Sequence, residues 1–151
     1  MPVPAIPPGY SSVTAYLIAQ DAKGALAWYA KAFGAEETMR LPGPDGRVMH
    51  AEFRIGDSLL MIGEQNADHA AYGPGHFGGT PVSFVLYVEN VDAVFARALA
   101  EGATEVSPLA DKPYGDRMGT LADPFGHRWH LATHIEDVAP EEIVRRMSSQ
   151  G

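Results

Sequence analysis

The sequence has 151 residues, of which 46% are hydrophobic and 20% charged, so it can bury the core of one domain and is not disordered by composition. It carries 11 lysine and arginine residues against 19 aspartate and glutamate residues. The resulting formal net charge of −8 argues against nucleic acid or an anionic membrane as a partner, and the absence of cysteine excludes disulfides, thiolate catalysis and zinc–thiolate sites.

Residues 1–12 lack the basic and apolar regions of a signal peptide. No apolar run approaches the roughly 20 residues that are needed to span a membrane. From the sequence we therefore expect a cytoplasmic protein.

An internal repeat organises the chain. Residues 13–21 resemble residues 82–90 at an offset of 69, and each stretch is a β-like run that ends in an acidic or amide residue. Each run precedes a helical apolar pattern, over residues 22–33 and 91–101. Asp21 and Asn90 are suitable N-caps for these two helices.

Each predicted helix ends at a glycine, Gly34 or Gly102, as a left-handed C-terminal cap requires. A short strand follows each glycine, and then two further strands come on either side of a turn. These pairs of strands are predicted at residues 47–55 and 58–63, and at 117–122 and 127–133. The sequence thus predicts an α+β protein with two tandem βαβββ modules, over residues 13–63 and 81–138.

The remaining segments are an N-terminal extension at residues 1–12, a linker at 64–80 that contains His69 and His76, and a C-terminal helical tail at 139–151. Pro140 is placed at the first position of the tail helix. His69 and His76 are expected to face solvent or to form a mobile lid.

Four local strings carry a resemblance to a known family. They are AKAFGA at residues 30–35, VMHAEFRIGD at 48–57, YGDR at 114–117 and DPFGHRW at 123–129. Together with the paired modules they resemble the vicinal oxygen chelate superfamily, which includes glyoxalase I, extradiol dioxygenases and bleomycin-resistance proteins, and in particular its PhnB-like branch. The resemblance implies two curved half-barrel sheets around a ligand cavity, with a helix on the convex side of each.

The resemblance also implies four metal-ligand positions, on the first and last strands of each module. In this sequence they fall on Thr14, on Leu60 (or Met61 if the register shifts by one), on Ser83 and on His130. Leucine is no ligand, and threonine and serine are poor ligands for a divalent transition metal. We therefore expect no metal cofactor, with His130 as a weak candidate ligand and a divalent metal ion as the alternative.

Because side chains alternate between the two faces of a strand, parity predicts which residues line the cavity. On the third strand, Met49, Ala51, Phe53 and Ile55 are predicted to form an apolar stripe toward the helix. The residues predicted to line the cavity are Thr14, Tyr16, His50, Glu52, Leu60, Ser83, Tyr87, Arg117 and His130.

Within this set, His50, Glu52 and His130 are the candidate catalytic residues, because they could bind a metal in a non-standard way or act as acid and base near neutral pH. Arg117 could hold a carboxylate or phosphonate, with Thr14, Tyr16, Ser83 and Tyr87 as further ligand contacts. The structural alternatives are hydrogen-bonded imidazoles, a paired Glu52, and a salt bridge from Arg117 to Asp116 or Asp123.

Three functions remain open at the level of sequence. The first is a small-molecule-binding protein without the usual metal site, for which the acidic charge favours a cationic ligand. The second is a lyase, isomerase or dioxygenase that uses His50, Glu52 and His130. The third is a non-catalytic regulatory module. A homodimer is expected, because half-barrel sheets leave edge strands that must be covered.

Overall fold

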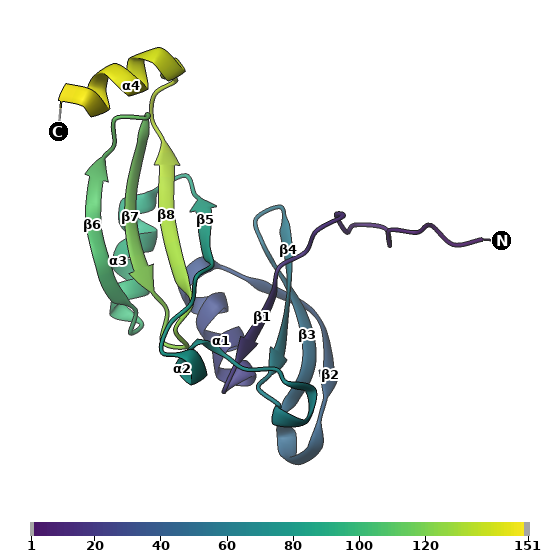
Figure 1. Cartoon of the computed structure of the whole chain (residues 1–151). Helices are drawn as coiled ribbons and strands as arrows, with labels where there is room; N and C mark the ends of the chain where they lie inside the picture. The colour runs from purple at the N-terminus through teal and green to yellow at the C-terminus, as the bar shows by residue number, and fades with distance from the viewer. Residues whose placement is uncertain (1, 150–151) are drawn as a thin grey trace. The chain divides into compact units, whose positions relative to one another are not determined.

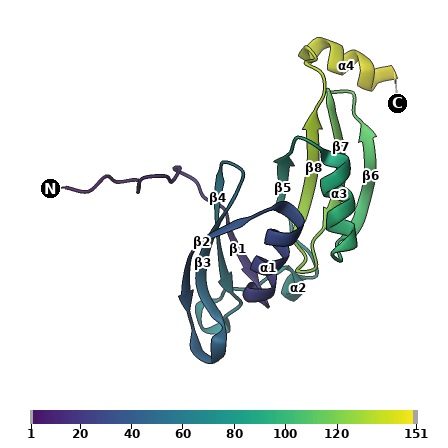
Figure 2. The same cartoon turned by 180° about the vertical axis from the view of Figure 1, so that it is seen from behind.

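The computed structural model describes residues 2–149, which form two compact units that divide between Gly79 and Thr80. Both are open four-stranded sheets with one helix along one face, and Figures 1 and 2 show the two faces of the sheets.

The first unit is built on a four-stranded sheet and the helix that packs on it. In chain order these are β1 (Tyr16–Ala19), α1 (Ala22–Phe33), β2 (Glu36–Pro42), β3 (Val48–Ile55) and β4 (Ser58–Glu64). The strand order is β1-β4-β3-β2, and β1 pairs with β4 in parallel while the other pairs are antiparallel. After β4 come a 3₁₀ turn (Ala67–His69) and the short helix α2 (Pro74–Phe77), which the sequence patterns did not predict.

The second unit repeats this arrangement. Its elements are β5 (Ser83–Tyr87), α3 (Val91–Ala100), β6 (Thr104–Asp111), β7 (Asp116–Ala122), β8 (Arg128–His134) and the terminal helix α4 (Pro140–Ser149). The strand order β5-β8-β7-β6 matches that of the first sheet, again with one parallel pair, β5 with β8. The predicted α+β fold with two βαβββ modules is therefore confirmed.

The predicted helix caps explain where α1 and α3 begin. The side chain of Asp21 accepts a hydrogen bond from the backbone N–H of Gly24 at 2.9 Å, and Asn90 does the same for Ala93 at 3.2 Å. At the end of α1, Gly34 has a φ of 70°, a left-handed conformation that favours glycine.

The core of each unit lies between the sheet and its helix. We call the side of each sheet that packs against α1 or α3 the helix face, and the opposite side the open face. The largest fully buried side chains all belong to this core: Tyr29, Phe53, Leu17, Ile62, Leu121, Leu131, Val48 and Val91. None of the helices in the described part of the chain is long and apolar enough to cross a membrane.

One residue of the predicted apolar stripe on β3 departs from the pattern. Ala51, Phe53 and Ile55 are buried as predicted, but the Met49 side chain is 60% exposed. The pairing of β2 with β3 shifts here, because Leu41 is opposite His50 while Pro42 is opposite Val48. Met49 is thus the extra residue of a β-bulge, which takes its side chain out of the core.

The register corrects one correspondence between the two modules. Glu52 is opposite Met61 in the first sheet, and Thr120 is opposite His130 in the second. Because Met61 and His130 are equivalent positions of the two sheets, Glu52 corresponds to Thr120 and His50 to Met118. The constant sequence offset of 69 residues between the modules had implied Gly119 as the counterpart of His50. The chain from Thr120 to its partner His130 is one residue longer than the chain from Glu52 to its partner Met61, which moves the offset by one and reverses the predicted face of β7.

Candidate functional site

Four side chains of the first unit form a continuous hydrogen-bond chain on its open face. The Tyr16 hydroxyl lies 2.9 Å from His50 Nδ1, and His50 Nε2 lies 3.0 Å from Glu52 Oε2. The second carboxylate oxygen of Glu52 accepts a hydrogen bond from the Tyr10 hydroxyl. The structure thus brings together three predicted site residues, Tyr16, His50 and Glu52, and adds Tyr10, which sequence reasoning left in the extension without a role.

Hydrogen bonds and burial determine which side chains of this hydrogen-bond chain are charged. Glu52 is only 5% exposed, yet hydrogen bonds from His50 and Tyr10 lower the pKa of its carboxyl group. The hydrogen bond to Glu52 raises the pKa of the Tyr10 phenol, and burial together with the Glu52 charge raises the pKa of Tyr16. At neutral pH the chain therefore holds one carboxylate and two neutral phenols.

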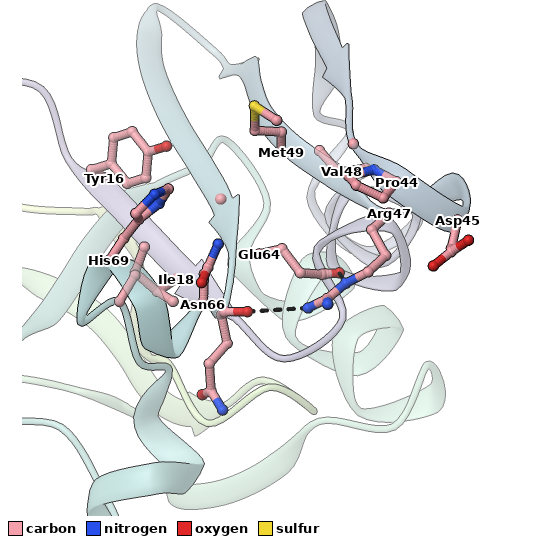
Figure 3. Close-up of a pocket in the computed structure, with 14 residues that line it drawn as sticks. Tyr16, Ile18, Pro44, Asp45, Arg47, Val48, Met49, Glu64, Asn66 and His69 are labelled. Carbon is pink, nitrogen blue, oxygen red and sulfur yellow. Dashed lines mark hydrogen bonds and ion pairs between the residues drawn. The ribbon is translucent and has the colours of Figure 1, made fainter.

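A pocket of about 440 Å³ adjoins this chain within the first unit. Figure 3 shows Tyr16 and His69 to the left of the pocket and Arg47 and Asp45 to the right. Its lining residues are Tyr16, Ile18, Gly43, Pro44, Asp45, Arg47, Val48, Met49, Gly63, Glu64, Gln65, Asn66, His69 and Ala71. The pocket volume is within the range that small-molecule sites occupy.

Both polar and apolar groups face this pocket. Arg47 is held by the backbone carbonyl of Gln65 at 3.1 Å and lies 3.8 Å from the Glu64 carboxylate, so its charge already has partners. Tyr16 and Met49 are 49% and 60% exposed. The linker contributes His69, which was expected to face solvent or to form a mobile lid, to the wall of the pocket.

In the second unit, His130 has hydroxyl partners at both ring nitrogens. Its Nδ1 lies 2.7 Å from Thr120 Oγ1 and its Nε2 lies 3.1 Å from Ser83 Oγ. This arrangement matches the structural alternative, a hydrogen-bonded imidazole. Ser83 and His130 were both predicted on the cavity face, and they lie together on the open face of this sheet.

The four implied metal-ligand positions do not offer a suitable set of donors. Tyr16 is opposite Met61 in the same way that Val85 is opposite His130, so Met61 is the counterpart of His130. Leu60, predicted to line the cavity, is 6% exposed and belongs to the core on the helix face. A set of Thr14, Met61, Ser83 and His130 contains one imidazole and no carboxylate, which does not fit a divalent transition metal. Within residues 2–149, no cluster of three or more histidine, aspartate or glutamate side chains has a metal-binding arrangement.

The structure corrects the placement of Arg117. Its guanidinium group bonds Asp92 on α3 at 2.9 Å and Asp111 on β6 at 3.1 Å. Asp92 lies at the start of the covering helix, so Arg117 is on the helix face and not on the cavity face. The predicted alternative partners have other contacts: Asp116 bonds Tyr87 and His134, and Asp123 bonds groups of its own turn and Trp129.

A second polar cluster was missed by sequence reasoning. On the open face of the second sheet, buried Asp116 accepts a hydrogen bond from the Tyr87 hydroxyl at 2.7 Å and lies 2.8 Å from His134 Nδ1. The other nitrogen of His134 lies 2.7 Å from Asp137. The cluster joins β5, β7 and β8 to the segment before α4, and Asp116 was present in the YGDR string.

This cluster predicts a pH-dependent stability. Hydrogen bonds to Asp137 and Asp116 raise the pKa of His134 above its ordinary value of 6.5. The stabilisation is therefore fully present below about pH 6.5 and is lost as the pH rises through the raised pKa. We expect His134→Gln to destabilise the protein more at about pH 6 than at about pH 9 in urea titrations.

Proton NMR of the His134 imidazole measures the pKa of this residue directly, with exposed His69 as the reference. An equal cost of His134→Gln at both pH values, or a larger cost at high pH, would contradict this assignment.

Comparisons with known proteins agree on one family. The model of the Glyoxalase/Bleomycin resistance protein/Dioxygenase superfamily matches residues 11–131. The protein Mb0911c of Mycobacterium bovis is 44% identical over 143 residues, which cover 93% of this chain and 94% of that protein.

Solved structures give the same fold. TioX from Micromonospora sp. ML1 is 29% identical with a TM-score of 0.66, and the match covers 83% of this chain and 100% of TioX. The PhnB protein from Bacillus cereus is 22% identical with a TM-score of 0.65, over 82% of this chain and 99% of that protein. The fold neighbours thus include the branch that the sequence strings resembled.

Proposed function

Because the chain belongs to the glyoxalase/bleomycin resistance protein/dioxygenase superfamily, we propose that it binds a small molecule in the pocket of the first unit, without the four-ligand metal site of the superfamily. The observation that carries this proposal is the 440 Å³ pocket beside the exposed Tyr16 ring. Tyr16 and Met49 offer apolar surface, while the adjacent hydrogen-bond chain offers one oriented hydroxyl. Ligand sites of other proteins combine these two properties.

Binding of an aromatic probe tests this proposal. We expect 1-methylnaphthalene to bind saturably with one site per chain in equilibrium dialysis. Tyr16→Ala removes the phenol ring from the pocket lining, and we expect it to weaken binding by about tenfold, since burying an aromatic ring contributes roughly 1.5–3 kcal/mol.

The matched control is Val85→Ala. Val85 is the counterpart of Tyr16 in the second sheet and is 54% exposed, but it does not line this pocket. We expect the control to leave binding unchanged. Absence of saturable binding, or binding that Tyr16→Ala leaves intact, would count against the pocket as the ligand site.

An enzyme remains the alternative, and one observation favours it. His50 lies between a hydroxyl and a carboxylate at hydrogen-bond distances, as an imidazole that transfers protons requires. This alternative needs a turnover that His50→Ala abolishes while ligand binding persists.

A further inference from the structure

The hydrogen-bond chain of the first unit has a defined direction. Glu52 is ionised, so both of its oxygens only accept hydrogen bonds. The Tyr10 hydroxyl therefore donates to one oxygen, and the Nε2–H of the His50 ring donates to the other. A neutral imidazole with its proton on Nε2 accepts at Nδ1, so the Tyr16 hydroxyl donates its proton to His50.

This direction decides what Tyr16 offers to its surroundings. The single hydroxyl proton of Tyr16 is used by His50, and the lone pairs of its oxygen remain as hydrogen-bond acceptors. The hydroxyl group of Tyr16 could both donate and accept, but within this hydrogen-bond chain it is available to other groups only as an acceptor. The carboxylate of Glu52, which lies two residues after His50 on β3, imposes this acceptor role on Tyr16 through the His50 ring.

The Tyr16 oxygen is positioned against the strand that lines the pocket. A Cβ atom at Gly63 on β4 would lie 2.9 Å from the Tyr16 hydroxyl oxygen, so only the absent side chain lets the phenol lie over this strand. Tyr16 and Gly63 both line the pocket. The acceptor is therefore at the wall of the pocket.

The charged groups around the pocket favour the same kind of ligand as a hydrogen-bond acceptor does. Asp45 and Glu64 bring two carboxylates to the lining, whereas the single guanidinium, on Arg47, is bonded to Gln65 and lies near Glu64. His69 adds an imidazole, and the whole chain carries a net charge of −8. The field of such a surface favours a positive ligand.

We infer that the pocket selects aromatic or apolar ligands that carry a hydrogen-bond donor, an ammonium group above all, and that the Tyr16 oxygen receives this donor. The inference rests on the proposed function, because it names the class of ligand for the same pocket. Tyr16 is the specificity-determining residue, and His50 and Glu52 are positioning residues that act through it.

Three probes with the same ring system test the inference. They are 1-methylnaphthalene, which has no donor, 1-naphthylmethylamine, which carries an ammonium, and 1-naphthylacetate, which carries a carboxylate. At about pH 8, where an ordinary imidazole is neutral, we expect the full chain to bind the ammonium at least about tenfold more tightly than the carboxylate. Equilibrium dialysis at constant ionic strength measures all three affinities.

Tyr16→Phe separates the phenol oxygen from general electrostatics, because it keeps the ring and the net charge. We expect this variant to lose most of the preference for the ammonium over the carboxylate, and to bind 1-methylnaphthalene within about threefold of the original affinity. The matched control is Tyr114→Phe, which removes a hydroxyl that bonds Met118 in the second unit and should keep the preference. Circular dichroism verifies that both variants fold.

Each outcome has a distinct meaning. Preference for the ammonium that disappears in Tyr16→Phe supports the inference. Equal affinities for the ammonium and the carboxylate, or a preference that persists in Tyr16→Phe, overturn it while the proposed function stands. Absence of saturable binding by all three probes overturns the proposed function and the inference together.

Discussion

Replacing Phe53 with alanine is expected to lower the free energy of unfolding of the first unit by about 3–5 kcal/mol. Phe53 is fully buried on the helix face of β3, and its ring stacks on Tyr29 with centroids 5.4 Å apart and planes 9° from parallel. Truncation removes this stacking and leaves a cavity between α1 and the sheet, which the surrounding side chains fill only in part.

The two tryptophans of the chain allow the two units to be followed separately. Trp28 lies in α1 and Trp129 in β8, so their indole N–H resonances report on the first and second units in a urea titration by NMR. Phe77→Ala is the matched control, because the Phe77 side chain is 70% exposed. A Trp28 midpoint that falls no further in Phe53→Ala than in Phe77→Ala would contradict this placement of the core.

Asp123→Ala is expected to destabilise the second unit by at least about 3 kcal/mol, because it leaves buried donors without an acceptor. The Asp123 carboxylate is 4% exposed and accepts at least three hydrogen bonds. They come from the backbone N–H groups of Phe125 and His127, at 2.9 and 3.1 Å, and from Trp129 Nε1 at 2.9 Å. These bonds hold the turn between β7 and β8 in its conformation.

The corresponding turn of the first unit supplies the control. Asp57 is exposed, and Ser58 donates to it at 3.3 Å. We expect Asp57→Ala to change the stability by less than about 0.5 kcal/mol, as surface substitutions do. If the Trp129 midpoint moves equally little in Asp123→Ala, the Asp123 carboxylate does not hold the turn.

The sequence predicted the fold well because its signals are local. Helix α1 occupies the predicted residues, since Asp21 caps its beginning and Gly34 ends it. The repeat predicted the order of elements in both modules, because each module needs the same pattern of buried side chains. Short segments such as α2 have no apolar periodicity and were therefore not predicted.

The face of a strand is less predictable than its existence. Arg117 was placed on the wrong face because the paired residues of β7 and β8 are one residue further apart along the chain than those of β3 and β4, and a shift of one turns every side chain over. Met49 does not point to the helix face with the rest of the predicted apolar stripe, because a β-bulge interrupts the alternation of side chains on β3. The predicted strand bounds already gave the two turns different lengths, but the constant offset between the modules did not take this into account, and the bulge leaves no clear signal in residue types.

The site was predictable only in part. Tyr16, His50 and Glu52 were singled out by parity, and the structure places them in one hydrogen-bond chain. Tyr10 completes the chain from 42 residues away, and His69 reaches the pocket from the linker. Such contacts depend on tertiary structure, and the spacing of residues along the chain carries no information about them.

The most direct test of the central claim, that the first unit holds the ligand site, is where an aromatic ammonium binds. Titration of 1-naphthylmethylamine into isotope-labelled protein, followed by amide NMR, resolves this position. We expect saturable shifts concentrated at Tyr16, Met49 and Gly63, which line the pocket. Shifts concentrated in the second unit, around Ser83 and His130, would contradict it.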